Sequence, residues 1–178
     1  ACYLKASVMI PSYPQAPDVK ITQITHSISK LVYKILDDCN GPVRMIGHSA
    51  GGHLASRMIC KNFLKKNMAK HIEKVISVSG LYDLRPLLMT KLNDILKLNY
   101  EEAVHESCFL YDPIDTKLTC WVGASERPEF LRQNRILAEA WSKKSKNIES
   151  YYDPGKDHFT VIDQLEEKES LLTQSITK

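Results

Sequence analysis

Short apolar runs alternate along the chain with longer stretches in which apolar residues recur at helical spacing. The short runs contain few polar residues and show no strict alternation, which is typical of strands that are buried on both faces of a sheet. They lie at residues 6–10, 43–46, 74–79, 118–122 and 148–152. Because strands that alternate with helices pair in parallel, this order predicts an α/β fold, with a mainly parallel sheet covered by helices on both faces.

Three helices are predicted from apolar positions that are three and four residues apart. The first places one apolar face on Ile21, Ile24, Ile28, Leu31, Val32 and Ile35, with Pro17 and Asp18 suited to its start. The second begins around Leu54, Met58 and Ile59, and the third contains Phe130, Leu137 and Trp141.

The stretch 84–115 has no obvious strand-like run, and we expect it to be an insertion of short helices at one end of the sheet. In open α/β sheets the ligand binds outside the carboxyl ends of the strands, where such an insertion can form a lid. The sequence therefore predicts a single domain over 1–178 that includes a small lid-like insertion.

Composition narrows the class of protein. With 43% hydrophobic and 25% charged residues, the chain is neither wholly disordered nor membrane-spanning, since no run approaches the roughly 20 apolar residues of a membrane helix. The 24 basic and 21 acidic residues are mixed without a basic stripe, which argues against nucleic-acid binding. Five irregularly spaced cysteines without a C-x-x-C pair fit a reducing compartment, so we expect a cytoplasmic location.

The segment "GHSAGGH" follows one predicted strand and precedes one predicted helix. Its first five residues match G-x-S-x-G, in the strand–turn–helix context that a nucleophilic serine requires. We expect the turn to hold Ser49 in a strained conformation, with Gly47 and Gly51 leaving space for neighbouring backbone. The Ala50 N–H lies at the helix N-terminus, where it can stabilise an oxyanion.

A nucleophilic serine needs a base and an orienting acid, which in this arrangement follow it in the order acid, then histidine. Of the six histidines, His158 lies in "DPGKDHF", just after the last predicted strand, where a loop can carry it over the sheet. In "WVGASERPEF", Glu126 follows the fourth strand at a turn, with Glu129 as its nearest rival. Further acidic alternatives are Asp112, Asp115, Asp153 and Asp157.

A metal site is not predicted. The sequence has no H-E-x-x-H motif, and His48 and His53 are five residues apart, which does not align them on one helical face. No cofactor is expected.

The segments "GHSAGGHLASRM", "SGLYDLRPLL", "VGASERPEF" and "KDHFTVID" together resemble the kynurenine formamidase-like branch of the α/β-hydrolases. The similarity runs from "PSYPQAPDVKI" to the C-terminal helix. It implies an α/β-hydrolase fold with Ser49 as nucleophile, His158 as base and Glu126 as acid, where several relatives have aspartate. The family also has an upstream H-G-G segment that completes the oxyanion hole. Nothing before residue 6 matches it, so we expect a fragment that lacks its first strands.

The resemblance implies hydrolysis of N-formylkynurenine to kynurenine and formate through a formyl-enzyme. A short-chain carboxylesterase and a non-catalytic binding protein with the same fold are the alternatives. We expect a small-molecule substrate, with no nucleic-acid or membrane partner, and the sequence leaves a homodimer open. Substrate-binding residues are not identified; Arg85 could grip a substrate carboxylate, although a surface arginine in a salt bridge explains it better.

Overall fold

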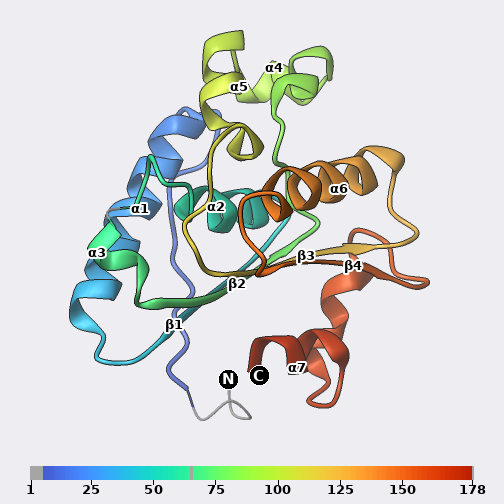
Figure 1. Cartoon of the computed structure of the whole chain (residues 1–178). Coiled ribbons are helices and arrows are strands. Elements are labelled where there is room, and N and C mark those ends of the chain that lie inside the picture. The colour runs from blue at the N-terminus through green and yellow to red at the C-terminus, as the bar shows by residue number, and fades with distance from the viewer. Residues whose placement is uncertain (1–5, 65, 178) are drawn as a thin grey trace.

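A four-stranded parallel sheet forms the centre of the protein. The computed structural model describes residues 6–64 and 66–177. Neighbouring strands follow chain order, namely β1 (Val43–His48), β2 (Ile72–Val78), β3 (Lys117–Gly123) and β4 (Ile148–Asp153) (Figure 1). The strands predicted at 43–46, 74–79, 118–122 and 148–152 are therefore confirmed.

Helices cover both faces of the sheet, as predicted. On one face lie α1 (Ile21–Asp38), α2 (Ala50–Met58) and α6 (Pro128–Ser142), while α7 (Leu171–Thr177) lies on the other (Figure 1). The short α3 (Lys66–Ala69) precedes β2, and the 3₁₀ segment η3 (Thr160–Glu166) precedes α7. The larger apolar core fills the space between the sheet and helices α1, α2 and α6. A smaller core on the opposite face joins the sheet to Val161 and Leu172.

Local signals explain where the first helix begins. Its predicted apolar face packs inward, with Ile24, Ile28 and Val32 buried. The helix begins at Ile21, three residues after Asp18, because the Gln23 side chain accepts a hydrogen bond from the Lys20 N–H at 2.8 Å and so caps the first turn.

The stretch 84–115 contains short helical segments, as predicted, together with one isolated β-bridge from Pro113 to Cys60. The helical segments are η1 (Arg85–Met89), α4 (Asn93–Leu96), α5 (Tyr100–Glu106) and η2 (Cys108–Leu110). In Figure 1, α4 and α5 stand on the outer side of the layer formed by α2 and α6. A small cluster of Leu84, Leu98 and Ala103 holds these segments together. Whether they close over a ligand stays a prediction.

The strand predicted at residues 6–10 is wrong. These residues are exposed and form no strand. A strand needs a neighbour for its backbone groups, and the first strand of the described sheet, β1, pairs only with β2. The apolar run at Val8, Met9 and Ile10 has strand-like residue types but no partner among the described residues.

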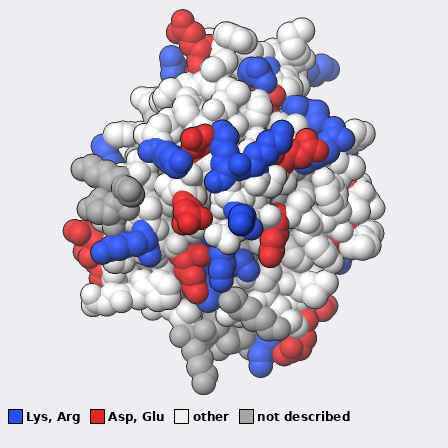
Figure 2. All heavy atoms as spheres, in the orientation of Figure 1, with Lys and Arg blue, Asp and Glu red and all other residues white. Residues whose placement is uncertain are grey.

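Charges of both signs are interspersed on the visible face (Figure 2). That face shows no unbroken basic stripe, and the exclusion of nucleic acid stays a prediction. Among the described residues, no helix has both the length and the apolar character to cross a membrane.

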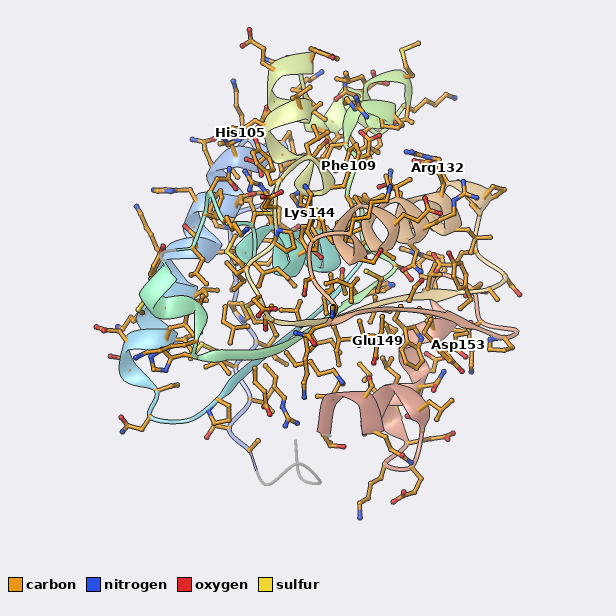
Figure 3. All side chains as sticks on the ribbon, viewed as in Figure 1. His105, Phe109, Arg132, Lys144, Glu149 and Asp153 are labelled. Atoms are coloured by element: carbon orange, nitrogen blue, oxygen red, sulfur yellow. The ribbon has the colours of Figure 1, made fainter. Side chains whose placement is uncertain are left out.

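A buried polar cluster joins α2 to α5. Glu106 accepts hydrogen bonds from Thr25 Oγ1 at 2.9 Å and from the Nε of Arg57 at 3.4 Å, and Arg57 also donates to the His105 carbonyl at 3.0 Å. His53 Nε2 lies 2.8 Å from the Glu106 carbonyl oxygen, so the neutral ring is the donor. Figure 3 labels His105 at the side of α5 that approaches α1.

His53 should make stability depend on pH. Burial lowers the pKa of His53 from its usual 6.5, more than the neighbouring Glu106 raises it. Below about pH 6.5 the unfolded chain binds a proton that the folded protein resists, so the free energy of unfolding should fall by up to about 1.4 kcal/mol per pH unit. Urea unfolding between pH 7 and 5 measures this. His53→Gln should flatten the slope and exposed His26→Gln should not; equal slopes in all three proteins would contradict the assignment.

Candidate active site

Ser49 lies in a sharp turn between β1 and α2. Its backbone has a φ of 55° and a ψ of −116°, a sparsely populated region that costs a residue other than glycine about 1–3 kcal/mol. The turn is held at both ends, because the Ser49 N–H donates to the Val78 carbonyl at 2.9 Å and the Ser49 carbonyl accepts from the His53 N–H at 3.1 Å. The strained strand–turn–helix arrangement predicted for Ser49 is what the structure has.

The glycines of this turn differ in what they do. A Cβ on Gly47 would lie 2.0 Å from the Gly51 carbonyl oxygen, so Gly47 allows the close approach of backbone that was predicted. A Cβ on Gly51 would meet nothing within 4 Å, and the prediction that Gly51 leaves space for backbone is wrong. That role belongs to Gly52, where a Cβ would lie 2.9 Å from the Gly80 Cα.

Substituting these glycines should therefore give opposite results. Gly47→Ala forces backbone apart and should lower the free energy of unfolding by about 1–3 kcal/mol or more. Gly51→Ala places a better helix former in α2 without a clash and should raise it by up to about 1 kcal/mol. Denaturant unfolding of both variants measures the change in the free energy of unfolding. A Gly47→Ala protein as stable as wild type would show that the Gly47 and Gly51 backbones are not in tight contact in solution.

His158 lies in the loop after β4 and reaches the serine. Its Nε2 is 3.1 Å from Ser49 Oγ, and its Nδ1 is 2.7 Å from Glu126 Oε2. The Asp157 carboxylate accepts the Phe159 and Thr160 N–H groups, each at 2.9 Å, at the start of η3. These hydrogen bonds lower the pKa of Asp157, so the carboxylate that fixes the loop stays ionised.

Glu126 is the carboxylate that contacts His158. Its side chain is fully buried, and its Oε1 accepts hydrogen bonds from the Gly123 N–H at 2.9 Å and from Ser79 Oγ. Both oxygens of this buried carboxylate therefore have a hydrogen-bond partner, as buried polar groups require. The three side chains Ser49, His158 and Glu126, which the sequence selected separately, thus form one hydrogen-bonded series.

The other carboxylates considered from the sequence have different partners. Glu129 pairs with Arg132 at 2.7 Å on α6. Asp153, labelled at the end of β4 in Figure 3, accepts from Trp121 Nε1 at 3.1 Å. Asp112 pairs with Lys144 and Lys61, and Asp115 accepts from Ser145 and Asn147.

Two aromatic rings pack against His158, and their place in the site was not predicted from the sequence. The His48 ring lies 4.7 Å away between centroids, and the Phe130 ring lies 4.2 Å away. His48 Nε2 is also 2.8 Å from the His158 carbonyl oxygen. Because burial lowers the pKa of His48, its ring is a neutral donor to that carbonyl at physiological pH. The position of His48 next to Ser49 was the available signal for this role.

The remaining predicted groups lie as follows. Ala50 is the first residue of α2, where a backbone N–H has no acceptor within the helix and can face an oxyanion. Arg85 donates to both Asp83 oxygens, at 2.8 and 3.0 Å, which agrees with the salt-bridge interpretation.

The prediction that an upstream oxyanion donor is missing concerns positions before residue 6, which lie outside the described residues. Among the described residues, no cluster of histidine, cysteine and carboxylate side chains could hold a metal ion.

Known proteins resemble this chain in both sequence and fold. Kynurenine formamidase from Danio rerio is 28% identical over an alignment of 184 positions, which covers 97% of this chain and 62% of that protein. The crystal structure of a candidate thioesterase from Silicibacter sp. TM1040 is 40% identical with a TM-score of 0.86, over 94% of this chain and 63% of that one. The carboxylesterase EstE1, cloned from a metagenomic library, shares the fold at 17% identity with a TM-score of 0.74, over 93% of this chain and 66% of that one.

These matches cover nearly all of this chain but only part of each relative. The chain spans about three fifths of the length of the curated relatives it matches. No protein-family model matches it. The parallel sheet and the similarity to solved structures show an α/β-hydrolase fold, and in sequence the chain is similar to kynurenine formamidases.

Proposed function

We propose that this protein is a serine hydrolase that cleaves a formyl amide on an aromatic ring, with N-formylkynurenine as its substrate. The observation that carries the proposal is the hydrogen-bonded series from Ser49 Oγ through His158 to Glu126, with distances of 3.1 and 2.7 Å. The similarity to fish kynurenine formamidases supports the choice of substrate.

In the first half of the reaction, His158 Nε2 takes the Ser49 proton while Oγ attacks the formyl carbon. Glu126 accepts the Nδ1–H of His158, which keeps Nε2 free to act as the base and stabilises the ring once it is charged. The Ala50 N–H donates to the oxyanion of the tetrahedral intermediate. His158 then protonates the departing aromatic amine, leaving a formyl ester on Ser49.

In the second half, His158 removes a proton from water as the water attacks the formyl ester. The bond between the formyl carbon and Ser49 Oγ then breaks, formate leaves, and His158 returns the proton to Oγ. The formyl carbon carries only a hydrogen, so little obstructs the attack. The amide nitrogen shares its lone pair with the ring, which weakens amide resonance and makes this bond easier to cleave than a peptide bond. Each step uses only protein side chains, backbone and water, so the reaction requires no cofactor.

Ester or thioester hydrolysis is the second candidate. The same three side chains can act on an acyl oxygen or sulfur ester, and the shape of the binding site decides among them. The specific observation in its favour is the 40% identity to the candidate thioesterase from Silicibacter.

The test compares kcat/KM of the intact protein for N-formylkynurenine, p-nitrophenyl acetate and acetyl-coenzyme A. Preference for the formamide by at least about 100-fold, a transition-state difference near 2.7 kcal/mol, supports the proposal. Preference for either ester supports the second candidate instead. If no substrate reacts and a fluorophosphonate fails to label Ser49, the protein is a non-catalytic binding protein and the proposal is wrong.

A further inference from the structure

Ser79 lies directly after β2 and contacts Glu126 from the side opposite His158. It is buried, with 1% of its surface exposed, and its φ is 52°. Its N–H donates to the Trp121 carbonyl at 2.7 Å, and its Oγ donates to Glu126 Oε1. The backbone and the hydroxyl of Ser79 are therefore both engaged at the carboxyl ends of β2 and β3.

The position of Glu126 depends on what holds Oε1. A glutamate side chain has one more rotatable bond than an aspartate, so it needs more contacts to hold its carboxylate in one orientation. In this protein Oε1 receives the Gly123 N–H at 2.9 Å and the Ser79 hydroxyl, while Oε2 faces His158 Nδ1 at 2.7 Å. Two donors on Oε1 fix the plane of the carboxylate and so direct Oε2 at the imidazole.

We propose that Ser79 is a positioning residue for catalysis, whose hydroxyl holds the Glu126 carboxylate oriented toward His158. The inference rests on the proposed hydrolase function, which gives the Glu126–His158 contact its purpose. Without the hydroxyl, Oε1 keeps one donor, and the carboxylate can rotate away from Nδ1. His158 is then less well oriented as a base, while the site that binds substrate is unchanged.

Two substitutions separate the hydroxyl from the unusual backbone of Ser79. Glycine adopts a positive φ readily, so Ser79→Gly removes the hydroxyl and retains the backbone conformation. Ser79→Ala also removes the hydroxyl but strains the backbone. If the Ser79 hydroxyl positions Glu126, both variants lose activity. If Ser79 serves only to hold the backbone conformation, Ser79→Gly should behave as wild type.

The experiment measures kcat and KM for Ser79→Gly and Ser79→Ala, alone and combined with Glu126→Ala. We expect kcat to fall about 10- to 100-fold in both single variants, the effect of losing a hydrogen bond to a charged group, with KM nearly unchanged. In the Glu126→Ala background, Ser79→Gly should change kcat by less than about 2-fold, because its partner is already absent. Wild-type kcat in Ser79→Gly, or an equal loss in both backgrounds, would overturn the inference.

A second readout does not depend on turnover. The His158 Nδ1 proton, held by Glu126, should give a far-downfield NMR signal in wild type that weakens in Ser79→Gly. Persistence of an unchanged signal would overturn the role of Ser79. If the wild-type protein hydrolyses nothing, the proposed function fails, and the NMR comparison still decides whether Ser79 holds Glu126 on His158.

Discussion

Ser49→Ala is expected to lower kcat for formamide hydrolysis by about 10⁶-fold, the usual effect of removing the nucleophile from such a series. His158 Nε2 lies 3.1 Å from the hydroxyl, so the substitution removes the group that this nitrogen activates. The residual rate should come from water attacking a substrate that the Ala50 N–H still polarises. Formate release is measured by stopped flow for the fast wild-type protein and by overnight assay for the much slower Ser49→Ala variant.

A neighbouring serine provides the matched control. Ser125 is exposed in the turn before Glu126, and Ser125→Ala should retain wild-type kcat. Labelling by a fluorophosphonate should likewise disappear in Ser49→Ala and persist in Ser125→Ala. Removal of the nucleophile lowers kcat by about 10⁶-fold. If Ser49→Ala retained more than about 1% of wild-type activity, its loss would be far smaller than that, and another group would be the nucleophile.

The parts of the site that the sequence predicted well are those encoded locally. Gly47 and Ser49 lie within a few residues of each other, and the order of strand, turn and helix around them is a short-range pattern. His158 was found because it follows the last strand, and the carboxyl ends of parallel strands meet at one edge of the sheet. Chain order is thus enough to select the serine and the histidine.

Residue spacing alone did not decide between Glu126 and Glu129; the family resemblance pointed to Glu126, and the structure shows why it is the one that contacts His158. Both follow β3 within six residues, and no periodicity distinguishes them. In the fold, the Glu126 N–H donates to the Gly123 carbonyl at 3.1 Å, and this tight turn directs the side chain inward. Glu129 lies in the first turn of α6, where it pairs with Arg132 instead.

Ser79 and the segment 6–10 show two other limits of the sequence. Ser79 is 47 residues from its partner Glu126, so no local pattern connects them. Residues 6–10 have strand-like composition, but strand formation depends on a neighbouring strand with which to pair, and the described sheet places none beside them. Both outcomes depend on contacts between distant parts of the chain, which residue type alone does not encode.

Glu126→Gln should lower kcat by about 10⁴-fold while leaving the fold intact. The reason lies in the donors around Oε1. The Gly123 N–H can only donate, so the amide oxygen of glutamine must occupy the Oε1 position and the NH₂ group must face His158. An NH₂ facing Nδ1 makes that nitrogen an acceptor, which places the ring proton on Nε2, and His158 then cannot take the Ser49 proton.

Glu129→Gln is the matched control for this loss, because it makes the same chemical change three residues away. Its carboxylate contacts Arg132 and Gln133 rather than His158, so kcat should stay within about 2-fold of wild type. The assay is kcat for N-formylkynurenine in both variants, with the far-downfield proton signal of His158 as a structural readout. If Glu129→Gln lost the activity and Glu126→Gln kept it, the acid would be misassigned. If both variants remained active, His158 would act without a carboxylate to orient it, and the hydrogen-bonded series would end at the imidazole.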